Sequence, residues 1–279
     1  MVSRYVNPFT DFGFKKLFGE EASKPMLIDF LNNLLPESKI VDLTFKDKEK
    51  LGSSKLERRA VYDIYCENDN GEKIIIELQK AKQNYFKDRT LFYSTFPIQE
   101  QAETGEWDFL LKAVYCIGIL DFKFDEDRIS KGEVVHTVQL KDQHHQVFYD
   151  KLQFVYLEMP HFNKVEKDIE TRLDKWLYFI KNLEDFQNIP ELFKDDVFKQ
   201  AFMKAEIAKY TKNEQEEYQQ SLKIYRDLKN VIDTAYDEGK LEGKLEGKLE
   251  VAKSLKEAGV PLDVISNSTG MSITDLNKL

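Results

Sequence analysis

The sequence predicts an α/β protein, with a sheet core flanked by helices and a helical C-terminal region. Three observations support this fold class. Apolar residues recur at helical spacing between residues 8 and 36. Runs rich in β-branched and aromatic residues predict strands at 40–45, 60–66, 73–78, 113–124, 134–140 and 153–159. From residue 169 onward the pattern is helical almost throughout.

The helical signals carry specific end residues. Thr10 is placed to cap a first helix, and Ser23 to cap a second one that holds Pro25 in its first turn. A further helix is expected over residues 83–103, with a break at Pro97 because proline lacks the N–H that an interior helical turn needs.

Composition limits the classes of function. Hydrophobic residues make up 42% of the 279 residues, which is enough for a substantial core. The net charge of -9 gives the whole chain no attraction for DNA or an anionic membrane. Residues 1–120 are nearly balanced, however, with 17 basic and 19 acidic side chains, so a basic cleft fits there.

Two features of the sequence indicate the cellular compartment. Cys66 and Cys116 each stand in an apolar run, which is typical of buried thiols in a reducing cytosol. No run has the length and apolarity of a signal peptide core or a membrane span. We therefore expect a soluble cytoplasmic protein without a membrane partner.

The strands at 60–66 and 73–78 form the most informative pair. The loop 69–71 ends in Gly71, which suits a three-residue hairpin turn. That turn places Asn68 opposite Glu72. Counting onward along both strands places Asp63 directly opposite Glu77, with Gln79 on the same face as Glu77.

Two carboxylates side by side in an apolar sheet repel each other, and one would gain a proton. A divalent cation removes this conflict, and hard oxygen ligands favour Mg²⁺ or Mn²⁺. The alternative is that this face lies in water, where Asp63 and Glu77 are ordinary solvated strand residues.

These residues also carry a family resemblance. The spacing from Asp63 to Glu77-Leu78-Gln79 resembles the PD-(D/E)XK nuclease superfamily, and the chain more closely resembles the Rpn family of recombination-promoting nucleases and putative transposases. The likeness spans roughly residues 4–160 and recurs in the Glu-Gly-Lys tail. It rests on the stretches 11–18 (DFGFKKLF), 30–32 (FLN), 76–80 (IELQK) and 85–89 (YFKDR), and on Gln101.

The resemblance implies a restriction-endonuclease-like mixed sheet core and Mg²⁺- or Mn²⁺-dependent cleavage of DNA. It implies that Asp63 and Glu77 are metal ligands and that Gln79 is catalytic in the place of the superfamily's lysine. Gln can hydrogen-bond but carries no charge. Lys80 is adjacent, but strand alternation points it to the other face unless the strand ends or bulges there.

Further site residues have two interpretations each. Asp11 is a candidate for an additional catalytic acid, or a helix N-terminal acid stabilised by the helix dipole. Arg89, with Tyr93 four residues later, suits a DNA phosphate and a stacked base, and equally suits a packed arginine that pairs with a core carboxylate. Lys80 is a third candidate for contacting DNA.

We expect four segments: a nuclease-like domain at 1–165, a helical region at 166–237, a repeat helix at 238–250 and a small helix-turn-helix-like tail at 251–279. The repeat is Gly-Lys-Leu-Glu three times over. It suits an exposed linker helix, or a self-associating helix with glycines at the contact. From Glu250 onward the tail has three Lys and four acidic residues, and this balance favours a structural role over binding to phosphates.

Three functions are compatible with these patterns. The first is a metal-dependent DNA endonuclease linked to recombination, transposition or the processing of mobile elements. The second is a DNA-binding accessory protein that has lost turnover with the missing lysine. The third is an oligomeric assembly module built on the C-terminal helices.

Overall fold

The computed structural model describes residues 3–46, 49–50, 60–102, 105–124 and 132–279. Most of the segment between the expected strands 40–45 and 60–66 lies outside these residues. The chain divides into two compact units, Met1–Tyr225 and Arg226–Leu279, which are described separately below. Within the described residues, no helix combines the length and apolarity needed to cross a membrane.

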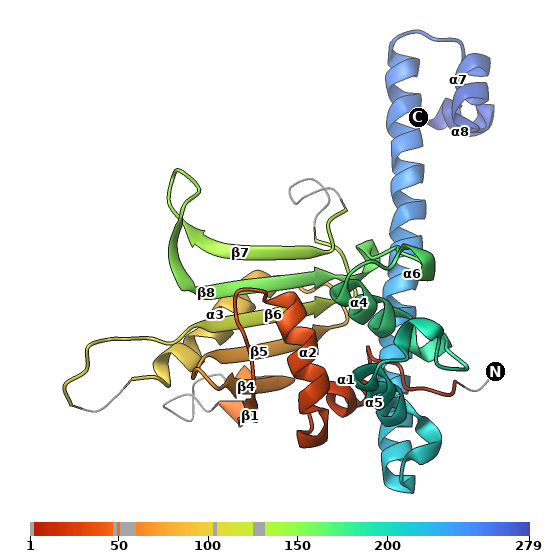
Figure 1. Ribbon diagram of the computed structural model, residues 1–279. Helices are drawn as coiled ribbons and strands as arrows, with labels where there is room; N and C mark the ends of the chain where they lie inside the picture. Colours follow the sequence, from red (N-terminus) through yellow and green to blue (C-terminus); the bar gives the residue numbers. More distant parts are fainter. Residues whose placement is uncertain (1–2, 47–48, 51–59, 103–104, 125–131) are drawn as a thin grey trace. The chain divides into compact units, whose positions relative to one another are not determined.

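A six-stranded mixed sheet forms the centre of the first unit, in the order β1-β4-β5-β6-β8-β7 (Figure 1). The parallel pairs are β5 with β6 and β6 with β8, and the remaining pairs are antiparallel. The strands of this sheet are β1 (Leu43–Phe45), β4 (Ile64–Asn68), β5 (Lys73–Gln79), β6 (Val114–Leu120), β7 (Val135–Lys141) and β8 (Val147–Glu158). A separate two-stranded ladder pairs β2 (Glu49–Lys50) with β3 (Ala60–Val61).

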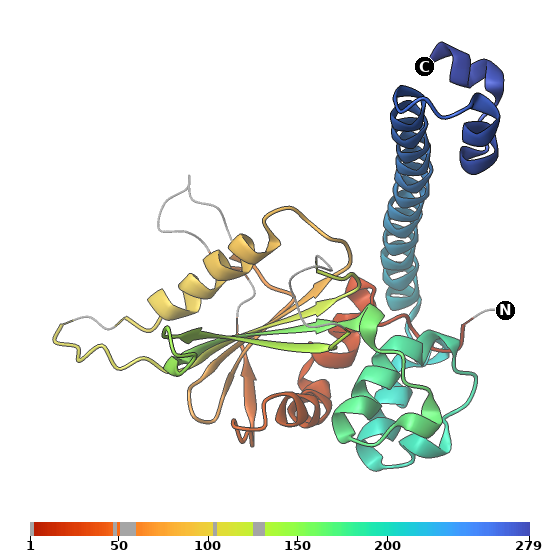
Figure 2. The same cartoon turned by 90° about the horizontal axis from the view of Figure 1, so that it is seen from above.

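Helices cover both faces of the sheet, so the predicted α/β fold with a mixed sheet is confirmed. Figure 2 shows α3 over one face and α1 and α2 over the other. The α-helices of the first unit are α1 (Asp11–Phe18), α2 (Lys24–Leu34), α3 (Phe86–Gln99), α4 (Arg172–Asn182), α5 (Asp196–Ala205) and the first part of α6 (Lys212–Glu257).

The two faces of β5 pack into different cores. Ile74, Ile76 and Leu78 belong to the larger core, which also contains residues of α1, α2, α4 and α5. Ile75 belongs to the smaller core beneath α3. Side chains alternate along a strand, so Glu77 lies on the same side as Ile75, beneath α3. Lys80 lies on the opposite side, with Ile76 and Leu78 of the larger core.

The ends of α1 and α2 only partly follow the prediction. The Thr10 hydroxyl accepts a hydrogen bond from the Gly13 N–H at 3.0 Å, so the predicted cap of α1 is confirmed. Pro25 lies in the first turn of α2, also as predicted. Ser23 stands at the predicted N-cap position of α2, but the expected side-chain cap is wrong, because its hydroxyl donates instead to the Lys16 carbonyl at 3.1 Å.

Pro97 lies inside α3, so the predicted break of this helix is also wrong. Proline cannot donate a backbone hydrogen bond to the carbonyl four residues earlier, here that of Tyr93. The Tyr62 hydroxyl donates to this carbonyl at 3.1 Å. The helix ends two residues later at Gln99, so most of its length is unaffected.

The second unit contains the rest of α6, with α7 (Leu262–Thr269) and α8 (Ile273–Lys278). Its small core joins Ala252, Ile265 and Leu276. Gly270 ends α7 with a positive φ of 68°, and the Ser272 hydroxyl caps α8. The Gly-Lys-Leu-Glu repeat is helical within α6. The segment boundaries at 165, 237 and 250 stay predictions.

Candidate active site

The hairpin β4–β5 places the candidate carboxylates. Gly71 adopts a φ of +81°, a conformation that glycine reaches without strain. The Asn68 side-chain oxygen accepts hydrogen bonds from the N–H groups of Asn70 and Glu72, at 3.0 and 2.9 Å. This loop fixes the register, and all four ladder pairs from Glu67 with Lys73 to Ile64 with Ile76 follow it.

The ladder stops one pair before Asp63. The predicted continuous strand over 60–66 is interrupted at Tyr62 and Asp63, between β3 and β4. Asp63 is therefore not a regular ladder partner of Glu77. Its carboxylate accepts a hydrogen bond from the Leu78 N–H at 2.7 Å, which ties it to β5 by its side chain.

Both carboxylates are poorly solvated. Burial is the main cause that raises the pKa of Glu77 to about 8, and the negative charge of Asp63 adds to it. The Arg89 guanidinium opposes this shift. Burial also raises the pKa of Asp63, against the hydrogen bond from Leu78. One oxygen of Glu77, Oε1, is buried and has no hydrogen-bond partner among the described residues.

Gln79 is buried and hydrogen-bonded at both ends of its amide. Its nitrogen donates to the Ala81 carbonyl at 2.9 Å, and its oxygen accepts from Arg89. Arg89 also donates to Gln83, and its guanidinium lies over the ring of Tyr93, 5.8 Å from the centroid. These contacts resemble the predicted alternative in which Arg89 is a packed arginine beside the core carboxylates. A role for Arg89 or Tyr93 in contacting DNA stays a prediction.

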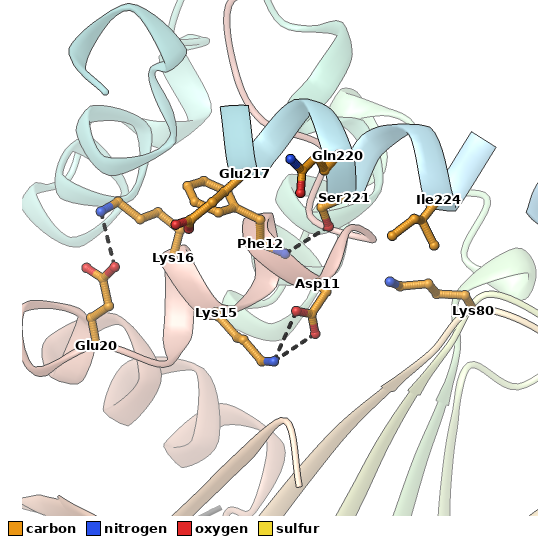
Figure 3. Close-up of a pocket in the computed structure, with 10 residues that line it drawn as sticks. All are labelled: Asp11, Phe12, Lys15, Lys16, Glu20, Lys80, Glu217, Gln220, Ser221 and Ile224. Atoms are coloured by element: carbon orange, nitrogen blue, oxygen red, sulfur yellow. Dashed lines mark hydrogen bonds and ion pairs between the residues drawn. The ribbon is translucent and has the colours of Figure 1, made fainter. Parts of the chain in front are cut away.

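A pocket of about 440 Å³ lies on the other side of the strand end (Figure 3). Asp11 and Lys15 of α1 form an ion pair at its wall, with 2.9 Å between the charged atoms. Lys80 directly follows β5 and lines the same pocket. The negative charge of Asp11 acts on two neighbouring groups. It helps to raise the pKa of Asp63, and it opposes the lowering of the Lys80 pKa by burial.

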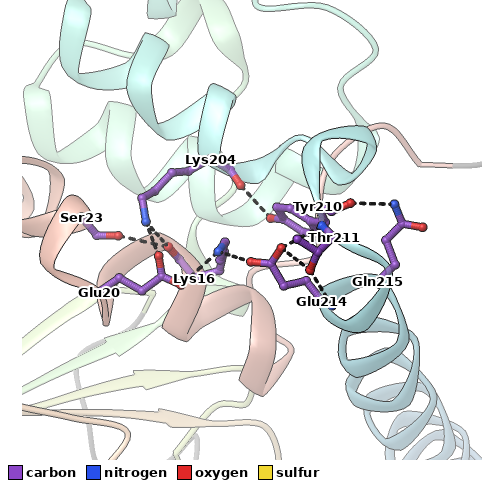
Figure 4. Close-up of polar contacts among 8 residues, drawn as sticks. All are labelled: Lys16, Glu20, Ser23, Lys204, Tyr210, Thr211, Glu214 and Gln215. Atoms are coloured by element: carbon purple, nitrogen blue, oxygen red, sulfur yellow. Dashed lines mark hydrogen bonds and ion pairs between the residues drawn. The ribbon is translucent and has the colours of Figure 1, made fainter.

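A polar network fixes α1 against α5 and α6 (Figure 4). The Lys16 ammonium pairs with Glu214 at 2.6 Å and with Glu20 at 3.1 Å. Lys204 pairs with Glu20 at 2.5 Å. Glu214 also accepts a hydrogen bond from the Thr211 N–H, where α6 begins. The network ties the helix that supplies Asp11 and Lys15 to α5 and to the start of α6.

The structure thus brings together Asp63, Glu77, Gln79 and Arg89, with Asp11 and Lys80 on the adjoining side. Sequence reasoning missed two residues. Lys15 acts electrostatically on Asp63, Glu77 and Lys80, and its spacing of four from Asp11 in a helix could have indicated the ion pair. Gln83 holds Arg89, and nothing in the local pattern indicates that contact.

The oxygen donors fit a hard divalent cation. Glu77 has a buried oxygen without a partner, and two neighbouring carboxylates favour a positive charge between them. No group of three or more His, Cys, Asp or Glu suited to a metal occurs in the described part of the chain. Mg²⁺ does not require one, because it is often held by one or two carboxylates with water and substrate phosphate.

Comparison with known proteins is consistent with this geometry. A model of the PD-(D/E)XK nuclease family transposases matches residues 8–235, which is most of the chain. A search of curated proteins and a search of solved structures each gave no match. The family match includes α1, the hairpin, α3 and the rest of the sheet. The chain therefore belongs to the PD-(D/E)XK nuclease family of transposases.

Proposed function

We propose that this protein is a metal-dependent endonuclease that hydrolyses phosphodiester bonds in DNA. Membership of the family supports a nuclease-type function connected with transposition. The observation that carries the finer proposal is the pair Asp63 and Glu77. Both carboxylates are poorly solvated, and the negative charge of Asp63 acts with burial to raise the pKa of Glu77.

Asp63 and Glu77 would hold Mg²⁺ or Mn²⁺. When bound, the ion supplies Lewis-acid chemistry, because it lowers the pKa of water and neutralises charge that grows on a phosphate. Asp63 is held in place by the Leu78 N–H. Arg89 and Gln79 fix each other beside Glu77, so the carboxylates are oriented before a substrate arrives.

The reaction is a hydrolysis and balances without a further reactant. A water oxygen forms a bond to phosphorus, and the bond from phosphorus to one deoxyribose oxygen breaks. The leaving oxygen gains a proton, and the products are a phosphomonoester end and a hydroxyl end. The role of Asp11 as an additional acid at this site is part of the proposal.

Nicking of supercoiled plasmid tests the proposal. The natural chain should relax the plasmid in Mg²⁺ or Mn²⁺ and fail in EDTA. Asp63→Ala should lower the rate by about 1,000-fold, within the range for loss of a group that stabilises the transition state. The variant must keep the thermal unfolding curve of a folded protein. Retained cleavage in such a folded variant contradicts the proposal.

The accessory role without turnover is the second candidate. It is favoured by one observation, that Gln79 has both ends of its amide engaged, at the position where the resemblance to the wider superfamily implies a lysine. The expected result is then salt-dependent DNA binding without nicking in either metal. Oligomerisation through the C-terminal helices and a cytoplasmic location stay predictions from the sequence.

A further inference from the structure

Lys80 occupies an unusual position for a lysine. It follows the last residue of β5, and its side chain is half-buried on the α1 side of the strand end. In Figure 3 its ammonium points into the pocket toward Asp11. β5 ends at Gln79, and Lys80 continues the alternation of the strand, which places its side chain on the side of the larger core and α1.

The Lys80 ammonium has no close ion pair or hydrogen bond within the residues that the structure describes. Asp11, the acid on the pocket wall that acts on the charge of Lys80, is already paired with Lys15. Burial lowers the pKa of Lys80, whereas the charges of Asp11 and Asp63 act to raise it. A half-buried cation without a direct partner costs free energy unless an anion reaches it.

Gln79 cannot take the same role without giving up existing contacts. Its amide nitrogen is held by Ala81 and its amide oxygen by Arg89. It is also buried, at 8% exposure. Lys80 in contrast lines an open pocket of about 440 Å³, and Asp63 acts on its charge. At the end of β5, Gln79 is therefore engaged at both ends of its amide, whereas Lys80 has no direct partner among the described residues and lies within electrostatic reach of Asp63.

We propose that Lys80, in place of Gln79, supplies the cation of the hydrolytic site by contacting the DNA phosphate that is attacked. This inference rests on the proposed nuclease function. Lys80 stabilises the negative charge that grows on the phosphate oxygens while the water oxygen bonds to phosphorus and the deoxyribose oxygen leaves. It transfers no proton in this role. Gln79 positions Arg89 and does not contact the substrate.

The first test measures DNA binding in EDTA over a range of salt concentrations, where no cleavage occurs. Each phosphate contact contributes about 0.9 to the slope of log affinity against log salt. Lys80→Met in the full chain should therefore make the slope shallower by about 0.9. Lys141→Met removes the same charge from an exposed position on β7 and should leave the slope unchanged. An unchanged slope in Lys80→Met overturns the proposal.

The second test measures single-turnover cleavage of the same duplex in Mn²⁺. Lys80→Met should slow cleavage on the order of 100-fold, and Lys80→Arg should restore most of the rate because it keeps the cation. Gln79→Lys should not rescue Lys80→Met, since it removes the acceptor for Arg89 and adds a like charge. A folded Lys80→Met that cleaves at the natural rate overturns the proposal.

The two tests separate this inference from the nuclease function itself. If the natural chain does not cleave, but Lys80→Met still loses one phosphate contact in the salt series, the proposed nuclease function fails and the Lys80 contact stands. If the natural chain cleaves and Lys80→Met matches it in rate and slope, the nuclease function stands and the Lys80 inference fails.

Discussion

The site region and the Gly-Lys-Leu-Glu repeat contain the same residue types in opposite surroundings. Around the hairpin and α1, Gly13 is buried and Glu77 and Lys80 lose much of their solvent. In the repeat, Gly243 and its charged neighbours are exposed on α6. Burial, and not residue identity, decides which glutamate has a raised pKa and which glycine is required by the fold.

The contrast between the buried site and the exposed repeat is tested most strongly by the pH dependence of stability that Glu77 causes. Its pKa lies at about 8 in the folded chain, above the ordinary value of 4.5. Its contribution to stability is therefore fully present below about pH 4.5 and is lost as the pH rises through about 8. Each pKa unit corresponds to about 1.4 kcal/mol, so the metal-free protein should lose up to a few kcal/mol of unfolding free energy.

Glu77→Gln removes this titration. In EDTA, the difference in melting temperature between Glu77→Gln and the natural chain should therefore grow in favour of the variant from pH 5 to pH 9. Glu246→Gln changes an exposed glutamate of the repeat and should show a constant difference. A constant difference for Glu77→Gln as well would mean that Glu77 is as solvated as Glu246, and the comparison would fail.

Gly13→Ala should have the next largest effect. A Cβ at Gly13 would collide with the Asn7 backbone carbonyl oxygen and lie 2.7 Å from the Thr10 hydroxyl oxygen that caps α1. Backbone atoms cannot move aside as a flexible side chain can, so overpacking should cost about 3 kcal/mol. Urea unfolding monitored by tryptophan fluorescence measures this, because Trp176 is buried in the same core.

A Gly13→Ala variant as stable as the natural chain would contradict the close approach of α1 to Asn7. The prediction also gives the segment 11–18 (DFGFKKLF) a physical basis. Its glycine allows the helix to pack closely, its aromatic residues fill the larger core, and Asp11 and Lys15 face the pocket.

The parts predicted from the sequence depend on local patterns. The glycine at the hairpin turn fixes the register, so the relation between the two strands could be counted from Gly71. Thr10 marks the start of a helix because its capping role depends on neighbouring backbone groups. The α/β class follows from the periods of 2 and 3.6 residues in the apolar pattern.

The parts that the sequence did not predict depend on tertiary contacts. The interruption at Asp63 is accompanied by a side-chain hydrogen bond to the next strand, and alternation alone predicts a continuous strand. Pro97 is tolerated because Tyr62, 35 residues earlier, supplies the donor that its position lacks. The contacts of Lys80 with the pocket depend on how α1 and α6 pack, which no pattern near residue 80 encodes.

Gly243→Ala has the smallest expected effect, and it should stabilise the helix instead of destabilising the protein. A Cβ at Gly243 meets no atom within 4 Å, so Gly243→Ala adds only the preference of alanine for a helix, about 1 kcal/mol. Amide hydrogen exchange in the full chain should then show about fivefold greater protection of residues 239–250, because that free energy is added to local opening. Reduced protection would mean that another backbone approaches the glycine column in solution. The repeat would then be a contact surface, and the contrast with Gly13 would disappear.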